Sequence, residues 1–216
     1  MDTLTREAVR YLGYGNHAVD EQTMALVRTS IEELRDIARD RIIYRIFELE
    51  TDGNESVKIG KLDIKSKNLA KNVRGCSQAV LLGATLGIET DQLIRKYTVT
   101  NMPRAVVLQA CAAAYLEEVL DQWQDGLKAE MLEEGWYLRP RFSPGYGDFD
   151  IRHQKELLQM LDGAKKIGLT VTDGMMLSPT KSVTAVIGVS KENVPCHRSG
   201  CEMCGKTDCI YRRNSR

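Results

Sequence analysis

The sequence predicts an α+β fold in which a largely antiparallel, twisted sheet is flanked by helices, followed by a Cys-rich C-terminal tail. Two observations support this prediction. Segments with helical periodicity and segments rich in strand-forming residues are mixed along the chain, without the strict alternation that a parallel sheet needs. The 216 residues, of which 43% are hydrophobic, also suffice for one sizeable domain with a small appendage. We therefore expect one domain over residues 1–190 and a separate tail over residues 191–216.

The first forty residues predict two helices. A short helix is expected at residues 5–12, before Gly13. A longer helix is expected at residues 21–39, because Asp20 is a suitable N-cap and apolar side chains recur after it at helical spacing. The charged residues between those apolar positions then form the solvated face of this helix.

The next segment predicts a hairpin followed by a short helix. Residues 41–49 are rich in β-branched and aromatic types, and a turn around Gly53 leads to a returning strand at residues 57–64. Ser66 then marks the N-cap of a helix that ends at Gly75.

The middle of the chain predicts a buried strand and a long helix. Residues 78–87 are nearly all apolar, and a run of this length next to glycines is typical of a buried strand. Its end, Thr85-Leu86-Gly87, lies either in the core or at a cleft. Pro103 marks the start of the longest helix, which we expect at residues 103–125.

The last third of the domain predicts one more helix and two more strands. The helix is expected at residues 152–162, and its core side carries three leucines. Residues 167–172 alternate as a strand does, residues 175–182 form an irregular loop, and residues 183–189 form the last strand.

Composition excludes several classes of partner. Lys+Arg and Asp+Glu both number 30, so the formal net charge of zero gives no electrostatic case for nucleic acid or an anionic membrane surface. No apolar run approaches the roughly 20 residues that span a bilayer. The polar N-terminus does not resemble a secretory signal. We therefore expect a cytoplasmic protein.

One loop combines unusual residue types over a short distance. It consists of Arg141-Phe142-Ser143-Pro144-Gly145-Tyr146-Gly147-Asp148. Proline restricts φ, and glycine reaches backbone conformations that other residues avoid, so this loop follows a tight path that a ligand can approach closely. Arg141 is a planar cation that suits a carboxylate, and Tyr146 offers a flat apolar face with a polar tip. The loop either binds a small polar molecule or is only a turn between a helix and a strand.

The cysteine tail is the second strong signal. Four cysteines follow one another with spacings of four, two and four residues: Cys196, Cys201, Cys204 and Cys209. Four thiolates this close suit one tetrahedral ion, by default Zn²⁺. The first two spacings also occur in plant-type iron–sulfur proteins, and free or disulfide-bonded thiols are a third interpretation.

The loop, together with three other segments, resembles the activation domain of vitamin B12-dependent methionine synthase. That family has an arginine, three residues and then Gly-Tyr in its S-adenosylmethionine loop, usually with proline before the glycine. Arg141, Pro144, Gly145 and Tyr146 agree with this spacing. The other family segments are matched in the same order by Thr85-x-Gly87 with Asp91, by the helix at residues 103–125, and by Met176-x-x-Pro179-x-x-Ser182-Val183.

Two features depart from the family pattern. The family continues after Gly-Tyr with a Cys-Pro-acid-His segment, whereas this chain has Gly147-Asp148-Phe149-Asp150. The acidic residue near the start of the family's domain also has no counterpart here.

Because no corrinoid-, folate- or homocysteine-binding domain fits in this length, the resemblance implies a stand-alone activator for a methionine synthase that lacks its own activation domain.

The resemblance implies an accessory role in a methyltransferase of methionine biosynthesis. The protein would bind S-adenosylmethionine and support the reductive methylation of cob(II)alamin carried by its partner. Arg141 would bind the ligand carboxylate, while backbone groups around Ser143, Pro144 and Gly145 would contact the adenine. Tyr146 would lie at the reacting methyl group as the catalytic residue.

The resemblance also suggests partners and alternatives. The partner would be the core of a methionine synthase or another corrinoid protein, and a flavodoxin or ferredoxin would supply electrons. From Arg198 on, five basic and two acidic residues give the tail a local charge of +3, which suits an acidic partner. The alternatives are an activator of another corrinoid methyltransferase protein and a non-catalytic zinc-knuckle docking module.

Overall fold

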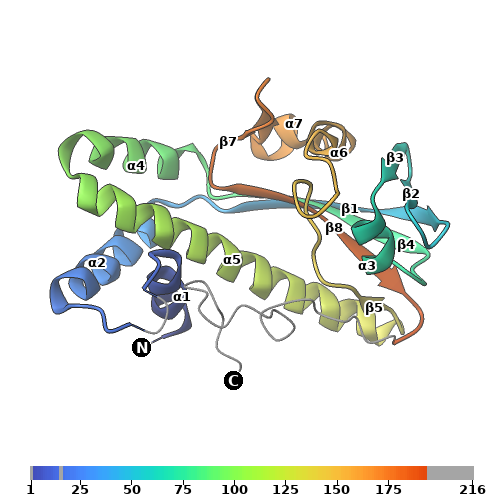
Figure 1. Cartoon of the computed structure of the whole chain (residues 1–216), viewed down its shortest axis with the longest axis horizontal. Helices are drawn as coiled ribbons and strands as arrows, with labels where there is room; N and C mark the ends of the chain where they lie inside the picture. The colour runs from blue at the N-terminus through green and yellow to red at the C-terminus, as the bar shows by residue number, and fades with distance from the viewer. Residues whose placement is uncertain (1, 15–16, 194–216) are drawn as a thin grey trace. The chain divides into compact units, whose positions relative to one another are not determined.

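The computed structural model of the chain describes residues 2–14 and 17–193 (Figure 1). These residues divide into two compact units. The first unit holds the described residues up to Asp40 together with Leu86–Asp121. The second unit holds Arg41–Thr85 and the described residues from Gln122 on, so that the longest helix takes part in both.

The first unit is helical in its described part. Its helices are α1 (Thr3–Tyr11), α2 (Glu21–Ile37), α4 (Ile88–Thr100) and the N-terminal part of α5 (Met102–Glu133). The two helices predicted for the first forty residues are confirmed, and Asp20 is the N-cap of α2: its carboxylate accepts a 2.8 Å hydrogen bond from the Thr23 amide. Gly87 precedes α4 with φ of 86°, and a Cβ there would come within 3.2 Å of the Arg39 carbonyl oxygen.

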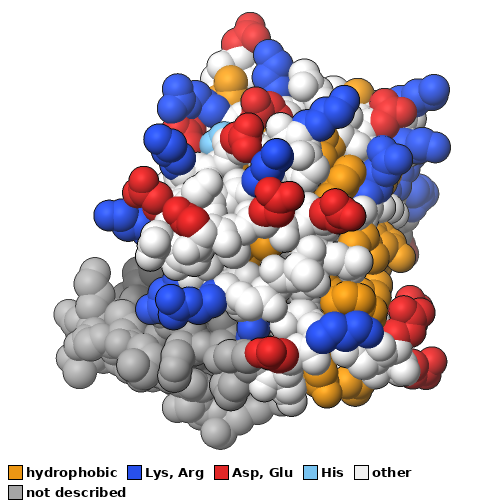
Figure 2. Space-filling view, turned by 90° about the vertical axis from the view of Figure 1, so that its right-hand side faces the viewer, with side chains coloured by type: hydrophobic (Ala, Val, Ile, Leu, Met, Phe, Trp, Pro, Cys, Tyr) orange, Lys and Arg blue, Asp and Glu red, His pale blue; other side chains and the backbone are white. Residues whose placement is uncertain are grey.

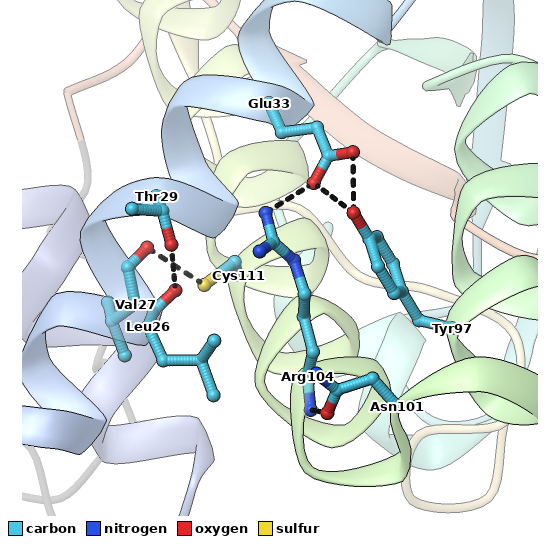
Figure 3. A network of polar contacts seen from close by, with 8 residues as sticks. All are labelled: Leu26, Val27, Thr29, Glu33, Tyr97, Asn101, Arg104 and Cys111. Carbon is cyan, nitrogen blue, oxygen red and sulfur yellow. Dashed lines mark hydrogen bonds and ion pairs between the residues drawn. The ribbon is translucent and has the colours of Figure 1, made fainter.

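A polar cluster joins three helices of this unit (Figure 3). Glu33 on α2 forms a 2.6 Å ion pair with Arg104 on α5, and it accepts a 2.9 Å hydrogen bond from the Tyr97 hydroxyl on α4. The Arg104 guanidinium also lies 4.7 Å from the centre of the Tyr97 ring, within cation–π range. The cluster therefore ties α2, α4 and α5 together through one carboxylate.

The second unit is built on a six-stranded sheet of order β3-β2-β1-β4-β8-β5. Its strands are β1 (Arg41–Thr51), β2 (Ser56–Ile59), β3 (Leu62–Lys65), β4 (Gln78–Thr85), β5 (Tyr137–Leu138) and β8 (Ser182–Ser190). All its strand pairs are antiparallel, which confirms the predicted fold class. Strand β4 pairs along its whole length with both β1 and β8, and every residue after Gln78 is buried, as its apolar sequence predicts.

Helices cover both faces of this sheet (Figure 1). Ile43 of β1 packs against a core cluster that includes Leu157 and Leu161 of α6 (His153–Leu161). The next residue, Tyr44, contacts Trp123 of α5, with ring centroids 5.2 Å apart. Consecutive strand residues point to opposite faces, so α6 and the C-terminal half of α5 lie on opposite sides of the sheet.

The predicted strand at residues 57–64 is wrong in one respect, because it forms two strands. Strands β2 and β3 are joined by a tight turn at Gly60, whose φ is 56°. Both strands alternate buried and exposed residues, but the phase shifts by one position across the turn. Because both strands show the same alternation of apolar and polar residues, the sequence pattern does not reveal the turn between them. The helix predicted after Ser66 is confirmed as α3 (Lys67–Asn72), and the Ser66 side chain accepts from the Leu69 amide.

The predicted strand at residues 167–172 is also wrong at its start. Ile167 is buried at the end of a short helix, α7 (Gly163–Ile167), and Gly168 ends this helix with φ of 69°. The strand is only β6 (Thr170–Val171), which pairs with β7 (Leu177–Ser178) in a separate two-stranded sheet. Strand β7 lies within the segment that was predicted to be an irregular loop.

Helix α5 continues beyond its predicted end at residue 125. Gly126 lies at an exposed position of α5, and a Cβ there would meet nothing within 4 Å. A glycine inside a helix costs about 1 kcal/mol of stability relative to alanine. Leu127 and Met131 follow on the same helix and are buried at 6% and 9% exposure. Burial of these two side chains offsets the cost of the glycine and extends the helix to Glu133.

The surface carries both signs of charge. On the face drawn in Figure 2, Lys and Arg side chains are interspersed with Asp and Glu, and hydrophobic side chains gather towards one edge. This distribution agrees with the formal net charge of zero. No helix in the described part of the chain is both long enough and apolar enough to cross a membrane.

Candidate functional site

The segment before the glycine-containing loop runs along strand β8. The Arg139 amide donates a 2.8 Å hydrogen bond to the Gly188 carbonyl, and Phe142 and Val186 exchange two backbone hydrogen bonds of 2.9 Å. These contacts fix the direction in which residues 139–142 approach the loop. The central sheet therefore positions the start of the predicted site.

The loop itself is closed by its own backbone. The Tyr146 amide donates to the Ser143 carbonyl at 3.2 Å, and the Gly145 amide donates to the Phe149 carbonyl at 2.7 Å. Gly145 and Gly147 have φ values of 94° and 56°, which side chains disfavour. A Cβ at Gly147 would also lie only 2.3 Å from the side-chain nitrogen of Asn68, so the end of that side chain would have to move.

Asp148 fastens the far end of the loop to helix α3. Its carboxylate accepts hydrogen bonds from the Ser66 hydroxyl at 2.5 Å, the Lys67 amide at 2.8 Å and the Asn68 amide at 3.1 Å. The Ser66 hydroxyl is the main cause that lowers the pKa of Asp148 below its usual range, and the two amides add to it. Sequence reasoning gave Asp148 no role, because its partners lie about eighty positions earlier in the chain.

Two phenylalanines anchor the loop in the core. Phe149 is only 1% exposed, and its ring lies 6.2 Å from the ring of Phe142 in a stacked arrangement. Phe149 belongs to the hydrophobic cluster of the second unit, and Phe142 packs against it. The aromatic residue between them in the loop, Tyr146, is instead 67% exposed. The same backbone therefore buries Phe149, half-buries Phe142 and presents the Tyr146 side chain to solvent.

Arg141 is half-buried and is contacted by helix α5. Its Nη1 donates a 2.7 Å hydrogen bond to Oε1 of Gln124. The Gln124 side chain in turn donates from Nε2 to the Arg139 carbonyl at 3.5 Å. No motif in the sequence pointed to Gln124. Its contact with Arg141 could be recognised only from the packing of α5 beside residues 139–141.

The other motif segments of the second unit meet on the same strands. Thr85, at the end of β4, pairs with Ser182 at the start of β8. Val186, which pairs with Phe142, lies four residues further along β8, or roughly 13 Å at the usual rise per strand residue. Gln154 of α6 also holds the later loop, since its Nε2 donates to the Met175 carbonyl at 2.6 Å. Strand β8 thus gathers the three segments.

The remaining predicted site residues are placed as follows. Pro144 is buried, Ser143 is half-buried and Gly145 is exposed, all within the loop. The four tail cysteines lie outside the described residues. Within residues 2–14 and 17–193, no group of three or more His, Cys, Asp or Glu side chains is arranged to hold a metal ion.

A cavity of about 320 Å³ lies elsewhere in the second unit. It is lined by residues of α6, α7 and β6, including Lys155, Asp162 and Leu169. None of the residues 141–148 lines it, so it gives no support to the predicted site.

Comparison with known proteins gives one family and a related fold. Residues 87–195, just over half of the chain, match the family model described as vitamin B12 dependent methionine synthase, activation domain. No curated protein matches the sequence. A crystal structure described as the MetH reactivation domain bound to AdoHcy matches with a TM-score of 0.58 at 12% sequence identity, covering 88% of this chain and 77% of that chain. At this identity the match shows a shared α+β fold.

Proposed function

Because the chain belongs to the family of vitamin B12-dependent methionine synthase activation domains, we propose that it binds S-adenosylmethionine and supports the reductive methylation of cobalamin on a partner. The observation that carries this proposal is the loop at residues 141–148. Its family motif is held between strand β8 and helix α3, while Tyr146 remains 67% exposed. The family resemblance first seen in the motifs is confirmed by the family match.

Three parts of the loop would hold the ligand. Arg141 would bind the carboxylate through its guanidinium, which suits that group in charge and shape. Backbone groups around Ser143, Pro144 and Gly145 would contact the adenine. Tyr146 would lie beside the methyl group as the catalytic residue, and its exposure supports a position where a partner can reach it. The solved relative is described as bound to AdoHcy, the demethylated product of this ligand.

The protein's contribution would be to hold the donor in line for methyl transfer. One electron from the reduced flavodoxin or ferredoxin would convert cob(II)alamin on the partner to cob(I)alamin, the nucleophile. S-adenosylmethionine would supply the methyl group from its sulfonium and leave as S-adenosylhomocysteine. Such a site would accelerate the reaction mainly by orienting the reacting groups, since no proton has to move. The departure after Tyr146 is compatible with this role, because Asp148 and Phe149 fix the loop to α3 and to the core.

Isothermal titration tests ligand binding directly. Wild-type protein should give saturable heat with S-adenosylmethionine, and Arg141→Ala should lose it. Arg152→Ala is the matched control, because Arg152 is a neighbouring exposed arginine that pairs with Asp150. Absence of binding to the wild type, both alone and with its corrinoid partner, would refute the proposal.

A spectroscopic assay tests the partner. The protein is mixed with a cob(II)alamin-loaded methionine synthase core, a reduced flavodoxin or ferredoxin, and S-adenosylmethionine. Appearance of the methylcobalamin spectrum supports the proposal. If the spectrum appears only with another corrinoid protein, the partner is that protein and not methionine synthase.

The tail and the cellular location complete the proposal. We propose that residues 191–216 form a separate module in which Cys196, Cys201, Cys204 and Cys209 bind one zinc ion or an iron–sulfur cluster. Metal analysis and a visible spectrum of anaerobically purified protein distinguish the two, because only a cluster gives a brown protein. A cytoplasmic location follows from the reducing conditions that such thiolates require.

A further inference from the structure

Helix α5 brings one side chain to the predicted ligand arginine. Gln124 lies outside the family motif, seventeen positions before Arg141, yet its Oε1 accepts a 2.7 Å hydrogen bond from Arg141 Nη1. Both residues belong to the second unit, and both side chains are partly shielded from solvent. A contact of this length to a charged donor is a strong hydrogen bond.

The amide of Gln124 has a defined orientation. Its Nε2 group donates to the Arg139 carbonyl at 3.5 Å, while its Oε1 faces Arg141. In the reversed orientation, the Gln124 NH₂ group would face the guanidinium of Arg141, so a donor would face a donor. Its oxygen would face the Arg139 carbonyl, so an acceptor would face an acceptor. The 2.7 Å contact with Arg141 selects this arrangement, and the longer contact with the Arg139 carbonyl agrees with it.

The carbonyl that orients Gln124 belongs to a rigid residue. The Arg139 amide donates to Gly188 at 2.8 Å, and its Nη2 donates to the Arg74 carbonyl at 3.0 Å. Arg139 is only 5% exposed. Strand β8 thus fixes Arg139, whose carbonyl lies within 3.5 Å of the Gln124 amide, and Gln124 accepts the hydrogen bond from Arg141.

We propose that Gln124 is a positioning residue that sets the Arg141 guanidinium to receive the carboxylate of S-adenosylmethionine; this inference rests on the function proposed above. An amide orients the guanidinium without adding a formal negative charge at that point. A glutamate in its place would put a carboxylate in contact with Arg141, where it would compete with the carboxylate of the ligand. Gln124 then favours ligands that carry a carboxylate.

The test compares two ligands that differ only in that group, S-adenosylmethionine and decarboxylated S-adenosylmethionine, by isothermal titration. Gln124→Met keeps the size of the side chain and removes its hydrogen bonds, and it should weaken S-adenosylmethionine about tenfold, the value of one charged hydrogen bond. Gln124→Glu should weaken it further. Both variants should bind the decarboxylated ligand as the wild type does, and the exposed neighbour Gln122→Glu should change neither affinity.

Three results would overturn the inference. Equal weakening of both ligands by Gln124→Glu would mean that Gln124 acts on the fold and not on carboxylate recognition. Unchanged binding of S-adenosylmethionine by Gln124→Met would mean that the contact does no positioning. The third is independent of any ligand: ¹⁵N NMR should show slower rotation of the Arg141 guanidinium in the wild type than in Gln124→Met, and equal rates would refute the inference even if S-adenosylmethionine is not the ligand.

Discussion

Two arginines of this protein are held in different ways. Arg104, in the first unit, meets the carboxylate of Glu33 at 2.6 Å, and the Tyr97 ring packs against it. Arg141, in the second unit, meets the amide of Gln124 at 2.7 Å. The geometry of the two contacts is similar, but one acceptor carries a full charge and the other only a dipole.

The two contacts differ in what they join. The carboxylate of Glu33 links three helices through Arg104 and Tyr97, so this cluster stabilises the fold. The loop that follows Arg141 is held by the buried ring of Phe149 and by the Asp148 contacts with α3. The loop is therefore fixed by apolar burial and backbone capping, and the proposed role of the guanidinium is to receive the ligand carboxylate.

The largest expected effect comes from the apolar anchor of the loop. Phe149→Ala should lower the free energy of unfolding by about 3–5 kcal/mol, because it removes a fully buried aromatic ring. Urea denaturation measures this loss. Met176→Ala, at a 62% exposed position of the same unit, is the control and should stay within about 0.5 kcal/mol of the wild type. A loss below about 1 kcal/mol in Phe149→Ala would show that the buried ring does not anchor the loop.

The ionic cluster should show a smaller effect on the same scale. Glu33→Ala should lower the free energy of unfolding by about 2–3 kcal/mol, since it leaves Arg104 without a charged hydrogen bond in a partly buried position. Glu33→Gln should lose about 1 kcal/mol, because a neutral acceptor remains. The exposed neighbour Glu32→Ala serves as the control. If glutamine at position 33 were as stabilising as glutamate, the contrast between the two arginines would fail.

The loop should respond to acid through Asp148. Its pKa is lowered in the folded protein, so its stabilising contribution is complete above the unfolded pKa of about 3.9 and is lost as the pH falls through the lower folded value. An NMR titration of the carboxyl carbon should show this low pKa. Ser66→Ala should raise it, because the Ser66 hydroxyl is its largest cause. The exposed control Ser56→Ala should leave the titration of Asp148 unchanged.

The smallest expected effect is on stability at alkaline pH, and it arises from Tyr97 in the first unit. The hydrogen bond from Tyr97 to Glu33 raises the pKa of the Tyr97 phenol, so its contribution is present below the unfolded pKa of about 10 and is lost as the pH rises through the higher folded value. Ultraviolet titration should detect the late ionisation. Because the chain has eight tyrosines, the difference from Tyr97→Phe assigns it. Glu33→Gln should return the pKa towards its usual value, and an unchanged titration would contradict the assigned cause.

The sequence by itself determined the features that depend on near neighbours. Asp20 and Ser66 were predicted as N-caps from their residue type and position, and each accepts a hydrogen bond from the amide three positions later. Strand β4 was predicted from its own apolar run. The order of residues within the loop at 141–148 was likewise enough to show the family motif. Such features are encoded within a few residues, where covalent geometry leaves few alternatives.

Only the tertiary structure decided which side chains from distant parts of the chain contact one another. The continuation of α5 past Gly126 depends on burial of Leu127 and Met131, which outweighs local helix propensity. Asp148 meets Ser66 across 82 positions, and Gln124 meets Arg141 because the sheet fixes residues 139–142 beside α5. Contacts of this kind arise when a fold brings distant elements together, and no periodicity or spacing in the chain records which side chains will face each other.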